Sequence, residues 1–405
     1  MTSTLHPARV PDDDLLRFAR AVTRHFYEGE EDADVQPLAD VAAEDFRAWW
    51  VLDDDRVVAN LGVFETDLSL PGGARLPTAA VTTVGVAQTM RRRGLLRAMM
   101  RACLDEARDR GEPLAALFAS ESEIYGRFGF GIAARHVAYR TIRWRVRFRD
   151  PVDVRLVRET MPEEALRVWP AIHDRMRDQR SGSVAPTTAA WRLGVLVDPP
   201  GWRDGATTRR LVEVPGRGYA RYRIKDGDAG DGPDATVLLS ELVATDPEAE
   251  AALWQHVCDL DLTARTRTWL RPVDDALPHL VTDPLALGAS TGPPLYVRVL
   301  DLPRILTART YDRSGSATLQ VVDPDGYVDG RWSLEAGPDG ASCEPATAEP
   351  DLVVPVETVA CLLFGGVPAT ALLAARRLEE RRPGAAADLD RLLATDRAPW
   401  TSAEF

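Results

Sequence analysis

The hydrophobic positions in the first part of the chain change period near residue 88. Two apolar runs, RVVANLGVF (56–64) and ARLPTAAVTTVGVA (74–87), flank the turn signal PGG and predict a pair of strands. Residues 95–107 then place apolar side chains at spacings of one, three and four, which predicts a helix that Gly111 ends. The stripe consists of Leu95, Leu96, Met99, Met100, Cys103, Leu104 and Ala107.

Similar patterns divide the whole chain into three mixed α/β units. The first is predicted to contain a further helix at 11–22 and strands at 114–120 and 136–146. In the second, from about 149, we expect helices at 162–180 and 245–260, strands at 216–224 and 235–244, a polar hairpin or loop at 226–234, and an edge strand before LPHLVTDPLAL. In the third, from about 298, we expect strands at 316–323, 330–337 and 351–356 and helices at 358–364, 368–382 and 387–394.

Composition excludes several classes of function. The net charge of −13 argues against a general nucleic-acid binder, because binding to phosphate backbones requires a basic surface. The N-terminus lacks the features of a signal peptide and no run is long enough for a membrane span, so we expect a cytoplasmic protein. The cysteines have neither CxxC spacing nor a nearby His, which predicts reduced thiols and no metal site. They are Cys103, Cys258, Cys343 and Cys361.

The segment VTTVGVAQTMRRRGLLRAMM (81–100) carries the most specific chemistry. A strand, a basic turn with glycine and a helix form an arrangement that binds pyrophosphate, because the first N–H groups of the helix are unpaired. Arg91, Arg92 and Arg93 would add positive charge, and Gly94 would let the backbone approach the ligand closely. The alternative is a solvated basic surface, but cations at a helix N-terminus oppose the helix dipole. A bound polyanion therefore explains them best.

Residues 81–130 resemble motifs A and B of the GCN5-related N-acetyltransferases (GNAT), whose pattern is Gln or Arg, two residues, Gly, one residue, then Gly or Ala. Arg91 and Gly94 match, whereas Leu96 stands where a small residue is expected. A narrower group shares that departure. The run RRRGLLRAM, followed by ASE, IYGRFGFG, LPHLVTD and a terminal EF, closely resembles the enhanced intracellular survival (Eis) acetyltransferases of actinobacteria, and the resemblance covers essentially the whole chain.

The resemblance implies both a fold and a reaction. It implies tandem GNAT-type domains, each a mixed sheet with flanking helices: a catalytic copy at 1–148 and a degenerate copy at 149–297. A sterol-carrier-protein-like α/β domain at 298–405 is implied to follow. Such enzymes are hexamers that transfer acetyl from acetyl-CoA directly to amines. We therefore expect a homohexameric N-acetyltransferase without metal, whose acceptor is a small cationic amine resembling an aminoglycoside, lysine or a polyamine.

The family pattern also implies the cofactor site. The splayed strand end that would hold the pantetheine arm and the thioester carbonyl corresponds to Val84, Gly85 and Val86. The pyrophosphate segment corresponds to Arg92, Arg93, Gly94, Leu95, Leu96 and Arg97. A second contact point with the cofactor corresponds to Ser120 and Glu121. Tyr125, in the pattern Tyr-x-x-x-Gly-Phe, matches the general acid, and a phenol of pKa ~10 is suited to protonating a thiolate. An interdomain packing role is the alternative for this tyrosine.

The general base implied by the resemblance is the C-terminal carboxylate, here that of Phe405. A frayed tail is the alternative, as at most chain ends. We expect no histidine near the motif except His136, which its apolar neighbours mark as structural. For the amine we consider Phe26, Glu28 and Glu404, with the acidic cluster at 28–34 attracting cations or forming a solvated loop. Trp49 and Trp50 are expected to pack in the core.

The second and third units offer no comparable chemistry. Thr245 and Asp246 begin a helix well, but Glu248 and Glu250 would repel a pyrophosphate, so this copy should be catalytically silent. In the third unit we expect a filled core rather than a lipid cavity, and its main role would be to deliver Phe405. Two alternatives remain: a tandem acetyltransferase resembling mycothiol synthase, and a lipid-binding or scaffold protein with a vestigial CoA site.

Overall fold

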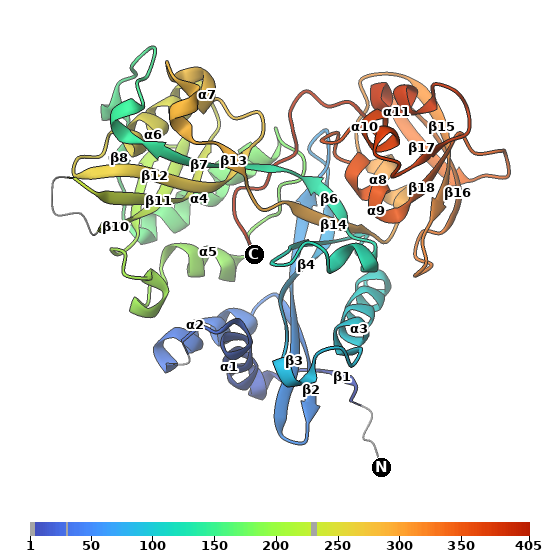
Figure 1. Ribbon diagram of the computed structural model, residues 1–405, viewed down its shortest axis with the longest axis horizontal. Coiled ribbons are helices and arrows are strands. Elements are labelled where there is room, and N and C mark those ends of the chain that lie inside the picture. Colours follow the sequence, from blue (N-terminus) through green and yellow to red (C-terminus); the bar gives the residue numbers. More distant parts are fainter. Residues whose placement is uncertain (1–4, 30, 228–232) are drawn as a thin grey trace.

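The computed structural model describes residues 5–29, 31–227 and 233–405. Residue 30 of the acidic cluster and residues 228–232 of the predicted hairpin or loop lie outside this part. Three sheets, of seven, seven and five strands, organise the chain into three units (Figure 1). The C-terminus lies between the units in this view. This architecture confirms the predicted α/β fold class.

The first sheet carries helices on its faces and has the strand order β1-β2-β3-β4-β5-β14-β6. Its strands are β1 (Pro7–Arg9), β2 (Phe46–Asp53), β3 (Arg56–Ser69), β4 (Arg75–Val86), β5 (Leu114–Phe118), β14 (Leu295–Val299) and β6 (Gly131–Ala134). Its helices are α1 (Leu15–Phe26), α2 (Asp32–Ala42) and α3 (Leu95–Asp109). The sequence pattern did not predict α2 or β2.

Two neighbouring tryptophans on β2 show how the faces are covered. Trp49 packs in the cluster that contains the apolar stripe of α3, whereas Trp50 packs with Phe18 and Val22 of α1. Successive side chains of a strand point to opposite faces, so one helix lies on each side of the sheet. Both tryptophans are buried, which confirms their predicted packing role.

The second sheet has the strand order β13-β7-β12-β11-β10-β9-β8. Its strands are β13 (Ser290–Thr291), β7 (His136–Ile142), β12 (Thr263–Pro272), β11 (Ala235–Ala244), β10 (Gly218–Lys225), β9 (Arg210–Val214) and β8 (Arg158–Glu159). Its helices are α4 (Pro162–Arg177), α5 (Thr188–Val195), α6 (Pro247–Asp259) and α7 (Leu277–Leu280). The prediction of an edge strand before residue 277 is wrong, because β7 and β11 flank β12 on both sides.

The first two units exchange strands. β7 falls inside the range predicted for the first domain but pairs with β12 of the second sheet. β14 falls in the second range but pairs with β5 and β6 of the first sheet. The two sheets are thus joined by crossing segments, and the predicted domain limits do not coincide with the limits of the sheets.

The third unit contains a five-stranded sheet with the order β17-β16-β15-β18-β19. Its strands are β15 (Gly315–Val322), β16 (Gly330–Gly337), β17 (Gly340–Pro345), β18 (Leu352–Pro355) and β19 (Glu379–Glu380). Its helices are α8 (Leu302–Ala308), α9 (Val356–Leu362), α10 (Ala369–Ala374) and α11 (Ala385–Leu393). The predicted helix at 368–382 ends early, because Arg376 adopts a left-handed φ of 57° and the chain then enters β19.

The third unit shares its core with the first sheet. Leu114 of β5 and Leu295 of β14 belong to the same buried cluster as Leu319 of β15 and Leu389 of α11. The apolar residues of the third unit therefore form a core, as predicted, and this core is continuous with one end of the first sheet. Among the described residues, no helix has the length and apolarity needed to cross a bilayer.

Candidate active site

β4 and β5 are paired over only a short part of their length. Parallel pairing runs from Thr78 opposite Leu114 to Ala80 opposite Ala116, although β4 extends to Val86. The end of β4 is therefore splayed away from its neighbour. Its backbone groups at residues 84–86 border a pocket instead of a strand.

A bulge at Thr83 produces this splay. Thr83 has a left-handed φ of 49°, and the Asn60 side-chain amide donates a hydrogen bond to its carbonyl. The register against β3 shifts at the same place, as expected for a bulge. A Cβ on Gly85 would lie 2.9 Å from His25 Cβ and 3.2 Å from Asn60 Oδ1. Glycine at position 85 therefore lets α1 and Asn60 pack against the splayed strand.

The turn before α3 exposes the start of that helix. Gly94 is the N-cap, with φ of 80°, and Arg92 also has a left-handed φ, of 62°. A Cβ on Gly94 would meet no atom within 4 Å, so the need for glycine is conformational and the space in front of it is open. The unpaired N–H groups at the start of α3 attract anions to this space.

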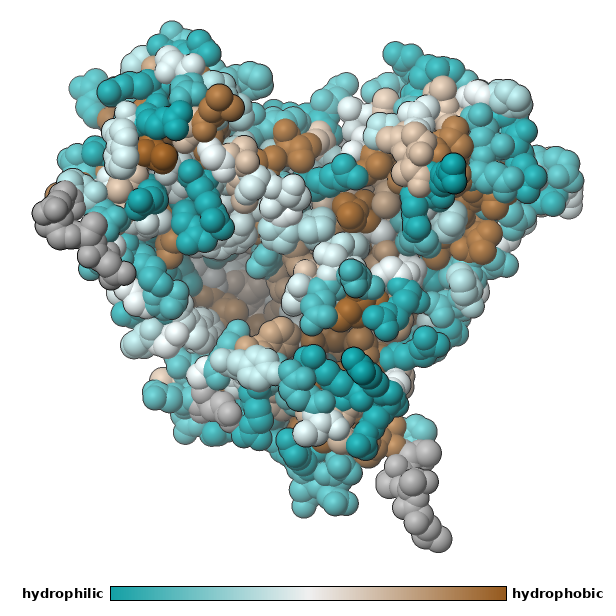
Figure 2. Space-filling model, in the orientation of Figure 1, coloured by the Kyte–Doolittle hydropathy of each residue, from teal (hydrophilic) through white to brown (hydrophobic). Residues whose placement is uncertain are grey.

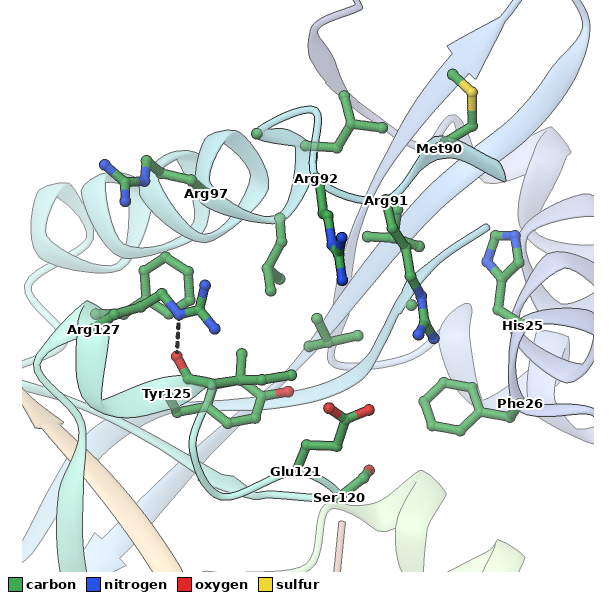
Figure 3. A pocket seen from close by; sticks show the side chains of 18 of the residues that line it. His25, Phe26, Met90, Arg91, Arg92, Arg97, Ser120, Glu121, Tyr125 and Arg127 are labelled. Atoms are coloured by element: carbon green, nitrogen blue, oxygen red, sulfur yellow. Dashed lines mark hydrogen bonds between the residues drawn. The ribbon is translucent and has the colours of Figure 1, made fainter. Parts of the chain in front are cut away.

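A pocket of about 710 Å³ lies between β4, α1, the start of α3 and the 3-10 turn Tyr125–Phe128 (Figure 3). We call it the arginine pocket. Arg91 and Arg92 extend into it from one wall and Arg127 from the opposite wall. Within the described part of the chain, Arg91, Arg92 and Arg97 form no ion pair. Their charge is therefore available to an anionic ligand.

The arginine pocket gathers nearly all predicted cofactor residues. Those that line it are Val84, Gly85, Val86, Arg92, Gly94, Leu95, Leu96, Arg97, Ser120 and Glu121. Arg93 is exposed but does not line the pocket, because the chain turns sharply between Arg92 and Gly94. Leu96 stands where the GNAT pattern has a small residue, but it does not obstruct the pocket, since its side chain forms part of the pocket wall.

Tyr125 lies at the far side of the arginine pocket. Its side chain is buried, and burial together with the nearby Glu121 carboxylate raises its pKa to about 12. The phenol is therefore protonated at neutral pH. In Figure 3 its hydroxyl and the Glu121 carboxylate both face the interior of the pocket. The position suits a proton donor to a group bound along β4.

A second pocket, of about 410 Å³, opens on the other side of Tyr125, and we call it the tail pocket. It shares Phe26, Val84, Ser120 and Tyr125 with the arginine pocket. Its remaining lining is Val81, Thr82, Thr83, Phe118, Ala119, Pro293, Glu404 and Phe405. Figure 2 shows a recess between the first and second units on this face, with hydrophobic surface at its floor. Two ligands bound in the two pockets would meet at Tyr125.

The C-terminal tail is folded rather than frayed. Trp400, Thr401 and Ser402 are buried, and the Phe405 ring packs edge-on against Phe118 with centroids 5.5 Å apart. The Glu404 side chain is exposed, although the groups around its carboxyl desolvate it enough to raise its pKa. The structure therefore brings Glu404 and Phe405 into the same cavity system as Tyr125.

Histidine is present at the site, contrary to our expectation. His25, at the end of α1, lines the arginine pocket and hydrogen-bonds the Asn60 side chain. Desolvation lowers the pKa of His25. The prediction that only His136 lies near the motif is therefore wrong, since α1 is distant from the motif in sequence. His136 is buried, shares a hydrogen bond with the Pro293 carbonyl at 2.7 Å and has its pKa lowered to about 4, as a structural histidine would.

Sequence reasoning missed several lining residues and included two that line neither pocket, Arg93 and Glu28. The missed residues are His25, Tyr27, Met90, Ile124, Arg127 and Phe128. Arg127 and Phe128 belong to the motif IYGRFGFG and could have been found from it, whereas His25 and Tyr27 arrive through the packing of α1. Glu28 lines neither pocket. Residues 32–34 of the acidic cluster belong to α2 instead of a loop.

The second unit closes the equivalent helix start with its own ion pairs. Asp246 caps α6 by accepting from the Ala249 N–H at 3.0 Å. Arg217 pairs with Asp246 at 2.5 Å and with Glu248 at 2.8 Å. These contacts use the groups that would otherwise meet a ligand, and the carboxylates would repel a phosphate. Among the described residues, no group of three or more His, Cys, Asp or Glu is arranged to hold a metal ion.

Comparison with known families matches each unit separately. Residues 6–133 and residues 182–299 each match a family described as an acetyltransferase (GNAT) domain, and residues 302–402 match a sterol carrier protein domain. An uncharacterized N-acetyltransferase of Streptomyces avermitilis is 38% identical, with 96% of each chain covered. N-acetyltransferase Eis of Mycobacterium tuberculosis is 33% identical over 84% of this chain and 83% of its own.

Solved structures agree with these matches. Eis1 from Mycobacterium abscessus superposes with a TM-score of 0.84 at 30% identity, covering 99% of this chain and 100% of its own. A GCN5-related N-acetyltransferase from Anabaena variabilis has the same fold, with a TM-score of 0.82 at 16% identity over 99% and 100%.

Fold and pocket together define a tandem GNAT N-acetyltransferase with a C-terminal sterol-carrier-protein-like domain. Within that class, the chain belongs to the Eis family. It is an enzyme that transfers an acetyl group to an amine.

Proposed function

We propose that this enzyme transfers acetyl from acetyl-CoA directly to a primary amine of a cationic acceptor, resembling an aminoglycoside, a lysine side chain or a polyamine. The observation that carries the proposal is the meeting of two pockets at Tyr125, one lined by arginines that form no ion pair with a described residue and the other by Glu404 and Phe405. The first suits a polyanionic donor and the second a cationic acceptor.

The arginine pocket fits the donor in three respects. The open start of α3 at Gly94 suits a pyrophosphate, and Arg91, Arg92 and Arg97 supply charge that no other described residue pairs with. The splayed backbone at residues 84–86 offers hydrogen-bonding groups to the pantetheine arm and to the thioester oxygen. Acetyl-CoA supplies an acetyl group activated as a thioester.

The lining of the tail pocket favours a cationic acceptor. Of the described residues that line the tail pocket, Glu404 alone has a charged side chain, and the carboxylate of Phe405, where it ends the chain, adds a second negative charge. Phe26, exposed at 39% and shared by both pockets, offers an apolar surface beside the reacting centre. Glu28, which lines neither pocket, is not part of this proposal.

The proposed reaction forms the N–C bond to the acetyl carbon and breaks the C–S bond. The Phe405 carboxylate takes the ammonium proton, directly or through a water, and the Tyr125 hydroxyl protonates the departing thiolate. The nitrogen loses its second proton as the amide forms, and this proton restores the phenol. A terminal carboxylate is ordinarily a weak base, of pKa about 3.3–3.7. Desolvation would make this carboxylate a stronger base, and desolvation does raise the pKa of the neighbouring Glu404 carboxyl in the tail pocket.

An acetylation screen tests the proposed acceptor class. Tobramycin, spermidine and lysine peptides are incubated with acetyl-CoA and the protein, and products are identified by mass spectrometry. We expect acetylation of at least one of these cations and none of uncharged amides. If none of the three is acetylated, the proposed acceptor class is wrong.

Replacing Tyr125 with Phe should lower kcat by about 100-fold, because the thiolate would leave without a proton donor. The Kd of acetyl-CoA should be unchanged, since the ring is retained. Because the Tyr125 pKa is about 12, the wild-type rate should not fall through loss of this proton below about pH 10. A pH profile of kcat checks this, and Tyr27→Phe, at an exposed residue of the same pocket, is the control. A Tyr125→Phe variant that retains the wild-type rate would exclude the phenol as general acid.

A further inference from the structure

The gap between two parallel strands occurs in both GNAT units but is occupied differently. In the second sheet, β11 and β12 pair from Ala235 to Leu238 only, although β11 extends to Ala244 and β12 to Pro272. In the first sheet the equivalent gap opens onto the arginine pocket. In the second sheet, the C-terminal tail lies against it.

Trp400 fixes the tail to one side of this gap. Its backbone N–H donates to the Ser181 carbonyl at 2.8 Å, and its indole N–H donates to the Leu270 carbonyl of β12 at 2.9 Å. The Arg271 guanidinium lies 5.1 Å from the Trp400 ring centroid and 5.0 Å from that of Trp254. A buried cation between two indoles stabilises this arrangement.

Ser402 fixes the tail to the other side. Its hydroxyl donates to Glu241 Oε1 of β11 at 2.6 Å and lies 3.2 Å from His173 Nε2 of α4. Arg221 Nε lies 3.1 Å from the other Glu241 oxygen. Ser402, Glu241 and His173 are buried, so the chain of polar groups is shielded from water. Such a buried contact is costly to break.

The clamp at Ser402 controls how far the chain end can move. Phe405 is the third residue after Ser402, a span of at most about 10 Å. Without this contact the preceding anchor is Trp400, five residues before Phe405, from which the chain end could reach roughly 17 Å. Anchoring at Ser402 therefore confines Phe405 to the neighbourhood of the tail pocket.

We infer that the second GNAT unit, silent as a catalyst, serves as a clamp: Glu241 and Ser402 are positioning residues that hold the Phe405 carboxylate at the reacting centre. The role of the carboxylate rests on the proposed function, whereas the clamp itself is independent of it. The strand gap that admits a ligand in the first unit receives the protein's own chain end in the second.

The test compares Ser402→Ala and Glu241→Ala, which each remove one partner of the hydrogen bond, with wild type in two assays on the full-length protein. Carboxypeptidase A removes a C-terminal phenylalanine only from an accessible tail, and loss of Phe405 is followed by intact mass. Steady-state acetylation of the amine found in the screen gives kcat and KM, with the Kd of acetyl-CoA from calorimetry. Ser183→Ala is the matched control, because the buried Ser183 hydroxyl has no hydrogen-bond partner among the described residues.

We expect both variants to lose Phe405 at least about tenfold faster than wild type and to lower kcat on the order of 10- to 100-fold, with the Kd of acetyl-CoA unchanged. Ser183→Ala should match wild type in both assays. Equal protection of Phe405 in all proteins would overturn the clamp. Faster release of Phe405 by the carboxypeptidase with an unchanged kcat would support the clamp but overturn the catalytic role of the carboxylate. Thermal unfolding checks that each variant is folded.

Discussion

A Gly-Ser extension after Phe405 should reduce kcat for amine acetylation at least about 100-fold while leaving the Kd of acetyl-CoA unchanged. The extension converts the terminal carboxylate into a peptide carbonyl, which cannot accept a proton at neutral pH. It also places additional chain in the tail pocket beside Tyr125. The arginine pocket, formed by other segments, is not altered. Stopped assays of acetylation and calorimetry with acetyl-CoA measure the two effects separately.

Phe405→Leu is the control for the extension, because it changes the side chain and preserves the carboxylate. We expect a decrease in kcat of less than about tenfold, since an apolar residue can still pack against Phe118. Intact mass verifies that each protein ends where intended. Full turnover by the extended, folded protein would exclude the carboxylate as base and leave Glu404 as the carboxylate of the tail pocket.

The arginine pocket could be predicted from local sequence because the segments that form most of it are contiguous. A strand, a basic turn and a helix follow one another between residues 74 and 109, and each has a clear period or turn signal. The stripe of α3, including Met99 and Cys103, is buried as the helical period requires. Gly94 occupies a left-handed N-cap that few other residues could adopt.

Features that depend on long-range packing could not be predicted in this way. An apolar period identifies β7 and β14 as strands but does not say which sheet each joins, so the exchange between units was not foreseen. His25 enters the pocket because α1 packs over Gly85. The pattern of SAEF alone resembles a frayed end, and the burial of Ser402 depends on Glu241 and His173, which are far away in sequence.

Charge reversal at Arg91 and Arg92 should weaken acetyl-CoA binding by at least about 100-fold. Each charge-assisted contact to a phosphate contributes roughly 1.5–3 kcal/mol, and two glutamates would in addition repel the ligand. Both arginines line the pocket and form no ion pair within the described part of the chain, so little of the loss should come from the fold. Calorimetry gives Kd, and thermal unfolding verifies stability.

Arg93→Glu is the matched control, because Arg93 is exposed, adjacent in sequence and absent from the pocket lining. A general electrostatic effect of the RRR run would weaken binding in all variants alike and would disappear at high salt, where exposed charges are screened. If Arg92 contacts the pyrophosphate directly, charge reversal at Arg92 should weaken acetyl-CoA binding more than charge reversal at Arg93, even at high salt. If the Arg93→Glu protein loses as much affinity as the double variant, the RRR run acts as a diffuse basic surface. The open start of α3 at Gly94 then does not hold the pyrophosphate.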